Sequence, residues 1–253
     1  MTASDRIDLS VIVIAYNEEL NLARCFSSLP VGVELIVLDS ASTDRTVEIA
    51  RSFGAQVHQR AFTHFAEQKN ACLALATRSW VLAVDADEEL SPELRKAIST
   101  LIQQGPQASG YTLQRRLVFM GHRMRFGKTQ DQPLRLFKRA GAAYVGSIHE
   151  EVQVAGEVQK LTGGVLWHYS YRDLSDYFQR FNRYTTAIAE RHAKEGHSFH
   201  FFGHILRPWI EFVNRYVFRL GFLDGYPGYT YALISSLYAY VKYAKLLEIK
   251  RRS

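Results

Sequence analysis

Two aspartates separated by one residue follow a continuous apolar segment in the first half of the chain. Asp85-Ala86-Asp87 comes directly after WVLAV, residues 80–84. In extended backbone, residues two apart point to the same side, so both carboxylates are expected to face one site. Converging carboxylates repel unless a cation lies between them, and oxygen ligands suit Mg²⁺ or Mn²⁺. Because Glu88 and Glu89 follow at once, a solvated acidic entry to a helix is the alternative interpretation.

Short apolar, β-branched runs predict the strands that position these acids. Three such runs are typical of strands buried on both faces: Leu9 to Ala15, Glu34 to Asp39 and residues 80–84. Helical patterns follow these strands: the first opens at Tyr16, the second begins at the capping residues Ser42 to Asp44, and another begins at Ser91. Alternating strands and helices predict a mostly parallel α/β sheet flanked by helices, in which ligands bind beyond the carboxyl ends of the strands. Four polar residues fall at such ends: Asn17, Asp39, Asp85 and Asp87.

The alternation of predicted strands and helices ends after residue 104. Strands joined by Gly-rich turns are predicted at Gly110 to Phe119, Leu134 to Arg139 and Gly164 to Tyr169, so that the sheet continues as a mixed one. Helices are predicted from Asp173 to about Glu195, from Ile205 to Leu220 and from Tyr229 to Ile249. The sequence therefore predicts a sheet-containing domain, residues 1–170, and a helical C-terminal region, residues 171–253.

Charge is distributed unevenly along the chain. Residues 1–100 hold 9 Lys and Arg against 14 Asp and Glu, whereas residues 101–200 hold 14 against 8 and residues 201–253 hold 8 against 3. A basic second half favours a phosphorylated or anionic partner. Nucleic acid is not expected, because no Gly-aromatic RNA-binding motif or zinc-finger spacing appears.

The cysteines and the apolar segments indicate the cellular compartment in which the protein is expected. Cys25 and Cys72, the only cysteines, occur in apolar helical patterns, which favours core positions in a reducing environment. The N-terminus lacks the basic-then-apolar order of a secretory signal. No apolar run approaches the roughly 20 residues that span a bilayer.

Four segments, at the predicted strand ends and in the helix between them, carry a resemblance. LSVIVIAYNEE (9–19), VLDSASTDRT (37–46), AEQKNACLALA (66–76) and WVLAVDADE (80–88) together resemble the inverting, nucleotide-sugar-dependent glycosyltransferases of family 2. The resemblance covers roughly the first hundred residues, in the family's order and spacing. It implies a GT-A-like, Rossmann-like fold, a hexosyltransferase activity and a bound Mg²⁺ or Mn²⁺.

The resemblance also implies roles for single residues. Ala15, Tyr16 and Glu18 stand where the family holds the nucleobase, and Asp39 where an acid contacts the base or ribose. Asp44 matches the second acid of the family's Asp-Gly-Ser-Thr-Asp stretch, whose glycine is missing here, but it could equally cap a helix. Lys69 stands near the diphosphate, Asp85 meets the ribose or bridges to the ion, and Asp87 binds the ion.

The second half resembles a narrower group. RLVFMGHRMRFG (116–127), GSIHEEV (146–152) and GFLDGYPGYTYALISSLYAYVKYAKLLE (221–248) are similar to small bacterial enzymes that glycosylate the inner core of lipopolysaccharide. That resemblance implies a β-glucosyltransferase with UDP-glucose as donor and a lipopolysaccharide core as acceptor. Transfer to another polysaccharide or lipid-linked acceptor is the alternative.

Inversion requires a base that removes the proton of the acceptor hydroxyl. The run His149-Glu150-Glu151 supplies our candidate, Glu150, with Asp131 as the rival. In a strand, Glu150 and Glu151 face opposite ways, so only one of them can serve. His149 is expected to touch the ion or the diphosphate. His168, between large aromatics, is interpreted as a core histidine with one hydrogen bond.

The basic regions predict the acceptor side. Eight cations lie between residues 115 and 139 against the single acid Asp131: Arg115, Arg116, Arg123, Arg125, Lys128, Arg135, Lys138 and Arg139. Arginine suits the phosphates of an anionic glycolipid. The two last predicted helices combine aromatic-rich apolar faces with flanking cations, as interfacial membrane helices do. We therefore expect a cytoplasmic enzyme, peripheral on the inner face of the bacterial inner membrane.

Two other classes remain open from the sequence. A nucleotidyltransferase also combines an α/β sheet, a metal and a nucleotide, but it favours a Gly-rich basic loop where Ala15 to Glu19 is acidic. A module that binds anions or RNA through the basic half leaves Asp39, Asp85 and Asp87 unexplained.

Overall fold

The computed structural model describes residues 6–146, 150–196 and 201–252, with the backbone alone for 201–203. The chain forms two compact units, and each is considered by itself. The sheet unit contains the described residues of Met1–Arg115 and Asp131–His168, and the helical unit those of Arg116–Gln130 and Tyr169–Ser253. The predicted boundary near residue 170 lies close to this division, but residues 116–130 belong to the helical unit. Its functional meaning stays a prediction.

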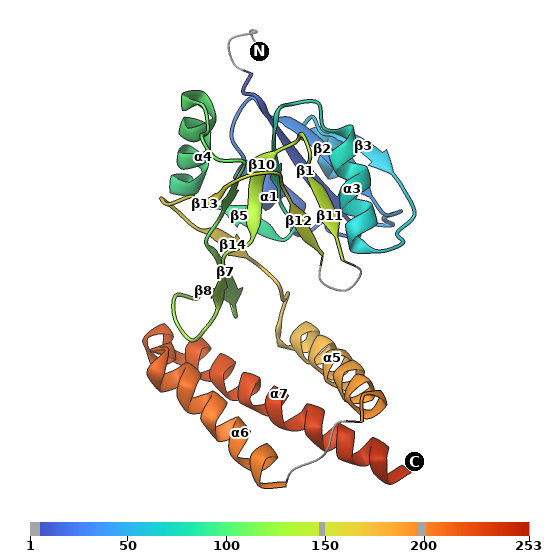
Figure 1. Cartoon of the computed structure of the whole chain (residues 1–253), viewed down its shortest axis with the longest axis vertical. Helices are drawn as coiled ribbons and strands as arrows, with labels where there is room; N and C mark the ends of the chain where they lie inside the picture. The colour runs from blue at the N-terminus through green and yellow to red at the C-terminus, as the bar shows by residue number, and fades with distance from the viewer. Residues whose placement is uncertain (1–5, 147–149, 197–200, 253) are drawn as a thin grey trace. The chain divides into compact units, whose positions relative to one another are not determined.

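The sheet unit is built on a seven-stranded sheet of order β13-β6-β10-β4-β1-β2-β3 (Figure 1). Its strands are β1 (Leu9–Ala15), β2 (Glu34–Asp39), β3 (Gln56–Gln59), β4 (Trp80–Ala83), β6 (Gly110–Thr112), β10 (Leu134–Lys138) and β13 (Val158–Lys160). The four strands β4, β1, β2 and β3 pair in parallel. β10 runs antiparallel to both β4 and β6, so the second half continues the sheet as a mixed one, as the sequence predicts.

Helices cover both faces of this sheet because the central strands are apolar on both sides. Leu9, Val11 and Val13 of β1 pack with α1 (Leu22–Ser27), α2 (Thr46–Ser52) and α4 (Pro92–Gln104), whereas Ile12 packs with α3 (Phe65–Leu75). The cysteines Cys25 and Cys72 are buried and free on opposite faces, which confirms their predicted core positions. The continuous apolar run of β1 thus reflects two-sided burial.

The strand register brings the predicted site residues to one edge. Ala15 is opposite Asp39 in the β1–β2 pair, and Ile12 is opposite Ala83 in the β1–β4 pair. All three strands are parallel, so their carboxyl ends lie together. Asn17, Asp39 and Asp85 therefore share an edge of the sheet, as the sequence predicts.

The loop after β1 differs from the predicted helix that opens at Tyr16. α1 begins only at Leu22 because the preceding backbone is bonded to the next loop. The amide of Asn17 donates to Oγ of Ser42 (2.9 Å), and the amide of Glu18 donates to Oγ1 of Thr46 (2.7 Å). Asn17 has a φ of 54°, outside the helical region. These bonds replace the first helical turn.

Smaller pairings complete the sheet unit. β5 (Glu88–Leu90) is antiparallel to β14 (Leu166–His168), and β11 (Ala143–Val145) is antiparallel to β12 (Glu151–Gln153). The first pair places His168 opposite Glu88. The second pair forms the hairpin that carries Glu150.

The helical unit contains α5 (Leu174–Lys194), α6 (Phe201–Val213) and α7 (Gly225–Arg252). A π-helical turn (Asn214–Phe218) and a 3₁₀ turn (Gly221–Asp224) join α6 to α7. The chain between the two parts of the sheet unit forms three short strands, β7 (Arg115–Phe119), β8 (His122–Arg123) and β9 (Gln130–Asp131). Its apolar side chains Leu117, Phe119 and Met124 pack with Tyr177 and Ile234. The single strand predicted for residues 110–119 is therefore two strands, β6 and β7, which belong largely to different units. Among the described helices, none is both long and apolar enough to cross a bilayer.

Candidate active site

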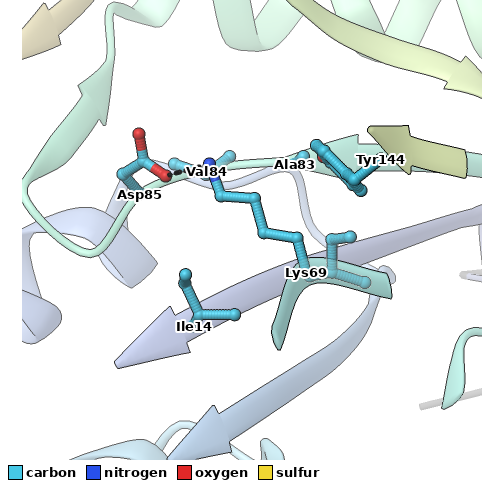
Figure 2. Close-up of a pocket in the computed structure, with 7 residues that line it drawn as sticks. Ile14, Lys69, Ala83, Val84, Asp85 and Tyr144 are labelled. Atoms are coloured by element: carbon cyan, nitrogen blue, oxygen red, sulfur yellow. Dashed lines mark ion pairs between the residues drawn. The ribbon is translucent and has the colours of Figure 1, made fainter. Parts of the chain in front are cut away.

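Lys69 lies at the centre of a group of charged side chains in the sheet unit. Its side chain extends from α3 and is 11% exposed. Its Nζ lies 2.9 Å from Oε1 of Glu150 and 3.4 Å from Oδ1 of Asp85. Figure 2 shows Lys69 pointing at Asp85, with Tyr144 close by, in the wall of a small pocket of about 10 Å³. Three predicted site residues therefore meet.

The two aspartates after β4 have different partners. β4 ends at Ala83, and the amide of Glu88 donates to the carbonyl of Asp85 (2.9 Å), which closes a tight turn. Asp85 to Asp87 therefore forms a turn and not the extended backbone expected from the sequence. Asp85 contacts Arg135, whereas Asp87 lies 3.3 Å from Nε2 of His168.

Glu88 is a fully buried carboxylate, so the alternative interpretation of the acidic run as a solvated helix entry is wrong for this residue. Its Oε1 accepts from Arg135 Nη2 (2.7 Å) and Arg115 Nη1 (3.0 Å), and its Oε2 accepts from the amide of Asp85 (2.9 Å). Burial raises the pKa of Glu88, which outweighs the opposing effect of Arg135. Arg135 is only 5% exposed, so a buried arginine holds two carboxylates together.

The pKa of Asp85 is shifted in the opposite direction to that of Glu88. Its Oδ2 accepts from Nη2 of Arg135 at 2.5 Å, and Lys69 lies on its other oxygen. Burial acts to raise the pKa of Asp85, but the charges of Arg135 and then Lys69 outweigh it and hold that pKa well below its usual range. Asp85 is therefore ionised at neutral pH.

Asp131, the rival base, is held by Arg115. Nε and Nη2 of Arg115 donate to its two oxygens at 2.9 and 2.5 Å. The Asp131 side chain is 54% exposed. Partial burial opposes a low pKa for Asp131, but the bidentate bond from Arg115 lowers it. A lowered pKa makes Asp131 a weaker base.

These contacts form one continuous set, which we call the charged network. Its members, in order of contact, are Asp131, Arg115, Glu88, Arg135, Asp85, Lys69 and Glu150. Four carboxylates face three cations, so the network carries one net negative charge when every group is ionised. Both candidate bases belong to it.

His168 is paired with Asp87, and its side chain is 22% exposed. Burial acts to lower the pKa of His168, but the hydrogen bond and charge of Asp87 outweigh it and raise that pKa. Within the described residues, no group of three or more His, Cys, Asp and Glu side chains is arranged to hold a metal ion. The other predicted ligand, His149, lies outside the described residues. Asp87 and Asp85 are thus the carboxylates that an ion bound with substrate phosphates could use.

The predicted nucleoside-binding residues lie at the ends of β1 and β2. Asp39 is fully buried and accepts from the amide (3.0 Å) and Oγ (2.5 Å) of Ser42, so it organises the β2–α2 loop. Asp44 accepts from Thr46 and from the amide of Glu19. Although burial opposes it, the bonds from Thr46 and Glu19 lower the pKa of Asp44. Tyr16 is 58% exposed.

The loop that contains Asp39 and Asp44 places Ala41 at a φ of 64°. This is the left-handed region, which costs an L-residue roughly 1–2 kcal/mol. We expect Ala41→Gly to stabilise the chain by about 0.5–1 kcal/mol, because the relief of strain exceeds the entropy cost of glycine. Urea unfolding followed by circular dichroism measures the change.

Ala74→Gly is the matched control, because Ala74 is exposed within α3. This change should destabilise by roughly 1 kcal/mol, the helix-propensity difference between alanine and glycine. Destabilisation by Ala41→Gly would contradict the strain argument.

Asn70 and Tyr144 attach the hairpin that carries Glu150 to α3. The side chain of Asn70 donates to the carbonyl of Tyr144 (2.8 Å) and accepts from its amide (2.8 Å). Asn70 thus has a structural role, although it is adjacent to Lys69. Burial raises the pKa of Tyr144. A more open pocket of about 370 Å³ lies between α3 and β11, lined in part by Asn70, Tyr144 and Gly146.

The burial of Glu88 and of two arginines differs from what the sequence pattern predicts. Arg115 and Arg135 were expected on a basic surface, but both are engaged with carboxylates in the sheet unit. One signal was present: Arg135 interrupts the apolar strand LRLFK, and a cation inside a buried strand needs an acidic partner. Glu151 is exposed, while Glu150, which precedes β12, contacts Lys69.

Comparison with known proteins agrees with this architecture. Residues 10–148, more than half of the chain, match the family described as Glycosyl transferase family 2. An uncharacterized glycosyltransferase of Rickettsia typhi is 27% identical over 97% of this chain and 88% of its own length. The lipopolysaccharide core biosynthesis glycosyltransferase LpsC of Rhizobium meliloti is 28% identical over 96% of this chain and 93% of its own.

A solved structure confirms the predicted fold. The mannosyltransferase PcManGT from Pyrobaculum calidifontis, solved with GDP-Man and Mn²⁺, has a TM-score of 0.53 and 16% identity, covering 96% of this chain and 87% of PcManGT. The α/β fold with a mostly parallel sheet is thus GT-A-like. The resemblance to a lipopolysaccharide core enzyme is also confirmed. By the match over residues 10–148, the chain belongs to glycosyl transferase family 2.

Proposed function

We propose that this glycosyltransferase moves a hexose, glucose in particular, from a UDP-sugar to a lipopolysaccharide core or a similar membrane-linked glycan, with inversion at the anomeric carbon. The observation that carries the proposal is the meeting of Lys69, Asp85 and Glu150 at one place in the sheet unit. The relationship to LpsC, a lipopolysaccharide core enzyme, supports the choice of acceptor. Family membership sets aside the nucleotidyltransferase and RNA-binding alternatives.

The donor diphosphate requires positive charge at this edge of the sheet. The charged network has four carboxylates and three cations, and Asp87, paired with His168, is a further carboxylate beside it. A pyrophosphate brought to such a place is repelled unless a divalent cation accompanies it. Asp87, with Asp85 close by in the chain, would hold Mg²⁺ or Mn²⁺. Such an ion would offset the charge that develops on the leaving diphosphate.

The protein groups around the diphosphate have separate tasks. Lys69 exchanges its carboxylate partners for a phosphate oxygen of the donor. Release from Lys69 frees Glu150 to remove the proton of the acceptor hydroxyl as that oxygen attacks the anomeric carbon. Ala15, Tyr16, Glu18, Asp39 and Asp44 form the edge against which the nucleoside lies.

The acceptor is expected to be anionic and linked to the membrane. Arg123, Arg125 and Lys128 of the helical unit are exposed and suit the phosphates of a glycolipid. Such an acceptor places the reaction at the inner face of the bacterial inner membrane. We therefore assign the sheet unit to donor chemistry and the helical unit to the acceptor and membrane.

The test is a panel of UDP-sugars with a truncated lipopolysaccharide acceptor, with products identified by mass. UDP-glucose is expected to give a product one hexose heavier together with free UDP. Absence of any hexose transfer from the whole panel would contradict the proposal.

Asp87→Asn tests the ion in the same assay. We expect the variant to lose at least about 10²-fold in turnover, because one ligand for the diphosphate-bound ion is lost. EDTA should lower wild-type turnover to a similar level, and added Mg²⁺ or Mn²⁺ should restore it. The matched control is Glu93→Gln, an exposed acid on α4, which should keep wild-type turnover. Full activity of Asp87→Asn in EDTA would exclude a catalytic ion.

A further inference from the structure

Tyr144 of the sheet unit carries an unpaired hydroxyl in the interior. The residue is 6% exposed, and its hydroxyl has no hydrogen-bond partner in residues 6–146, 150–196 and 201–252. A buried hydroxyl of this kind costs the folded state free energy, because it has lost water without gaining another partner. In native structures such a group commonly pairs with a ligand or a water molecule. The Tyr144 hydroxyl therefore marks a candidate binding position.

The neighbours of Tyr144 hold it in place. Its backbone amide and carbonyl are both bonded to the side chain of Asn70, each at 2.8 Å. Its ring packs edge-on against that of Phe137, with the ring centroids 6.3 Å apart. Because backbone and ring are both fixed, the hydroxyl is positioned before any ligand arrives.

The place of Tyr144 is beside Lys69 and Asp85. All three line the small pocket of about 10 Å³ (Figure 2), roughly the room that one oxygen atom needs. Nζ of Lys69 lies 5.7 Å from the centroid of the Tyr144 ring. Burial raises the pKa of Tyr144, so its hydroxyl keeps its proton at neutral pH and can donate. The pocket thus presents a carboxylate, an ammonium group and a hydroxyl.

This combination suits a neutral hydroxyl better than an anion. A phosphate oxygen can only accept hydrogen bonds, and the ionised carboxylate of Asp85 repels it. A hydroxyl both donates and accepts, so it can donate to Asp85 and accept from Tyr144. When Lys69 turns to the diphosphate, Oδ1 of Asp85 loses the ammonium group that lies 3.4 Å away. A ligand hydroxyl would then restore a donor to that oxygen.

We propose that Tyr144, together with Asp85, binds one hydroxyl of the hexose of the donor and thereby helps to determine which hexose is transferred. An epimer that carries this hydroxyl in the other orientation leaves both buried groups unpaired. A site built to bond a substrate hydroxyl discriminates strongly against substrates that do not supply it. The proposal rests on the proposed function, because it takes the ligand to be a UDP-hexose.

The experiment is calorimetric titration of the full chain, with Mg²⁺ present, by UDP and by UDP-glucose. Tyr144→Phe should bind UDP-glucose about fivefold more weakly than wild type, the effect of one hydrogen bond. Its affinity for UDP, which has no hexose, should change less than about twofold, because no hydrogen bond is lost there.

UDP-glucose analogues that each lack one hydroxyl identify the bonded group. Wild type should bind one of them more weakly than UDP-glucose. In Tyr144→Phe the penalty for removing that same hydroxyl should be about fivefold smaller, because the two groups no longer interact. The penalties for the other hydroxyls should be equal in the two proteins.

Tyr111→Phe is the matched control. Tyr111 is 4% exposed in the same unit, but its hydroxyl accepts from the amides of Gln107 and Ala108, at 3.1 Å each. Tyr111→Phe should lower the urea midpoint of unfolding and bind UDP-glucose as wild type does. Tyr144→Phe should keep or raise that midpoint, because it removes a hydroxyl that has no partner in the free protein.

Three results would overturn the assignment of Tyr144. The first is equal affinity of wild type and Tyr144→Phe for UDP-glucose, as expected if the hydroxyl meets only water. The second is an equal loss of affinity for UDP and UDP-glucose, which would place Tyr144 on the nucleotide. The third is a lowered urea midpoint, which would indicate a structural role. If wild type binds neither ligand, the proposed function fails and this inference with it; if wild type binds UDP-glucose and transfers hexose, each of the three results concerns Tyr144 alone.

Discussion

Replacement of Glu150 by glutamine is expected to lower kcat for hexose transfer by about 10²–10⁴-fold, the usual contribution of a general base. Glutamine keeps the shape of the side chain and an oxygen for Lys69, whose Nζ lies 2.9 Å from Oε1 of Glu150. Donor affinity should therefore change less than about threefold, well under the factor of ten that 1.4 kcal/mol represents. Kinetics with the acceptor give kcat, and calorimetric titration with UDP gives the affinity. A loss of both together would indicate a structural role instead.

Two neighbouring acids serve as comparisons for Glu150→Gln. Glu151→Gln is the matched control, because Glu151 is the adjacent residue and is exposed; it should retain wild-type kcat. Asp131→Asn removes the rival base, whose pKa is lowered by the bidentate bond from Arg115. We expect a smaller loss of kcat in Asp131→Asn than in Glu150→Gln, because a base of lowered pKa accepts a proton less readily. Retained transfer by Glu150→Gln together with its loss in Asp131→Asn would move the base to Asp131.

Replacement of Arg135 by methionine is expected to destabilise the folded chain by about 3–5 kcal/mol. Arg135 is 5% exposed and lies 2.7 Å from the fully buried carboxylate of Glu88 and 2.5 Å from Asp85. Its loss leaves two converging carboxylates without their shared cation. Urea unfolding followed by circular dichroism measures the free energy of unfolding.

A double-mutant cycle separates the ion pair from packing. Adding Glu88→Gln to Arg135→Met removes one of the uncompensated charges, so the double variant should recover about 1–3 kcal/mol relative to the sum of the single changes. Lys138→Met is the control on the same strand; Lys138 is exposed and contacts Trp80 through a cation–π interaction of about 0.5–1 kcal/mol. Additive single effects would show that Arg135 and Glu88 do not stabilise each other.

Much of the sheet unit follows from local sequence. The run from Leu9 to Ala15 predicts a doubly buried strand, which β1 is, because β-branched residues without alternation suit burial on both faces. Ser91 and Asp173 predict helix starts and accept from the amides of Leu94 and Asp176. These features depend on residues a few positions apart, so the sequence contains them directly.

The pattern of strands and helices is also enough to bring Asn17, Asp39 and Asp85 to one edge of a parallel sheet, since strand order and strand ends decide it. Which charges meet at that edge depends on the packing of distant segments. Glu150 lies 81 residues from Lys69, and Arg135 lies 47 residues from Glu88. An ion pair between such residues requires β10, the β11–β12 hairpin and the turn after β4 to come together. Whether Glu88 is solvated or buried is therefore a property of packing, because a carboxylate has the same local pattern in either environment.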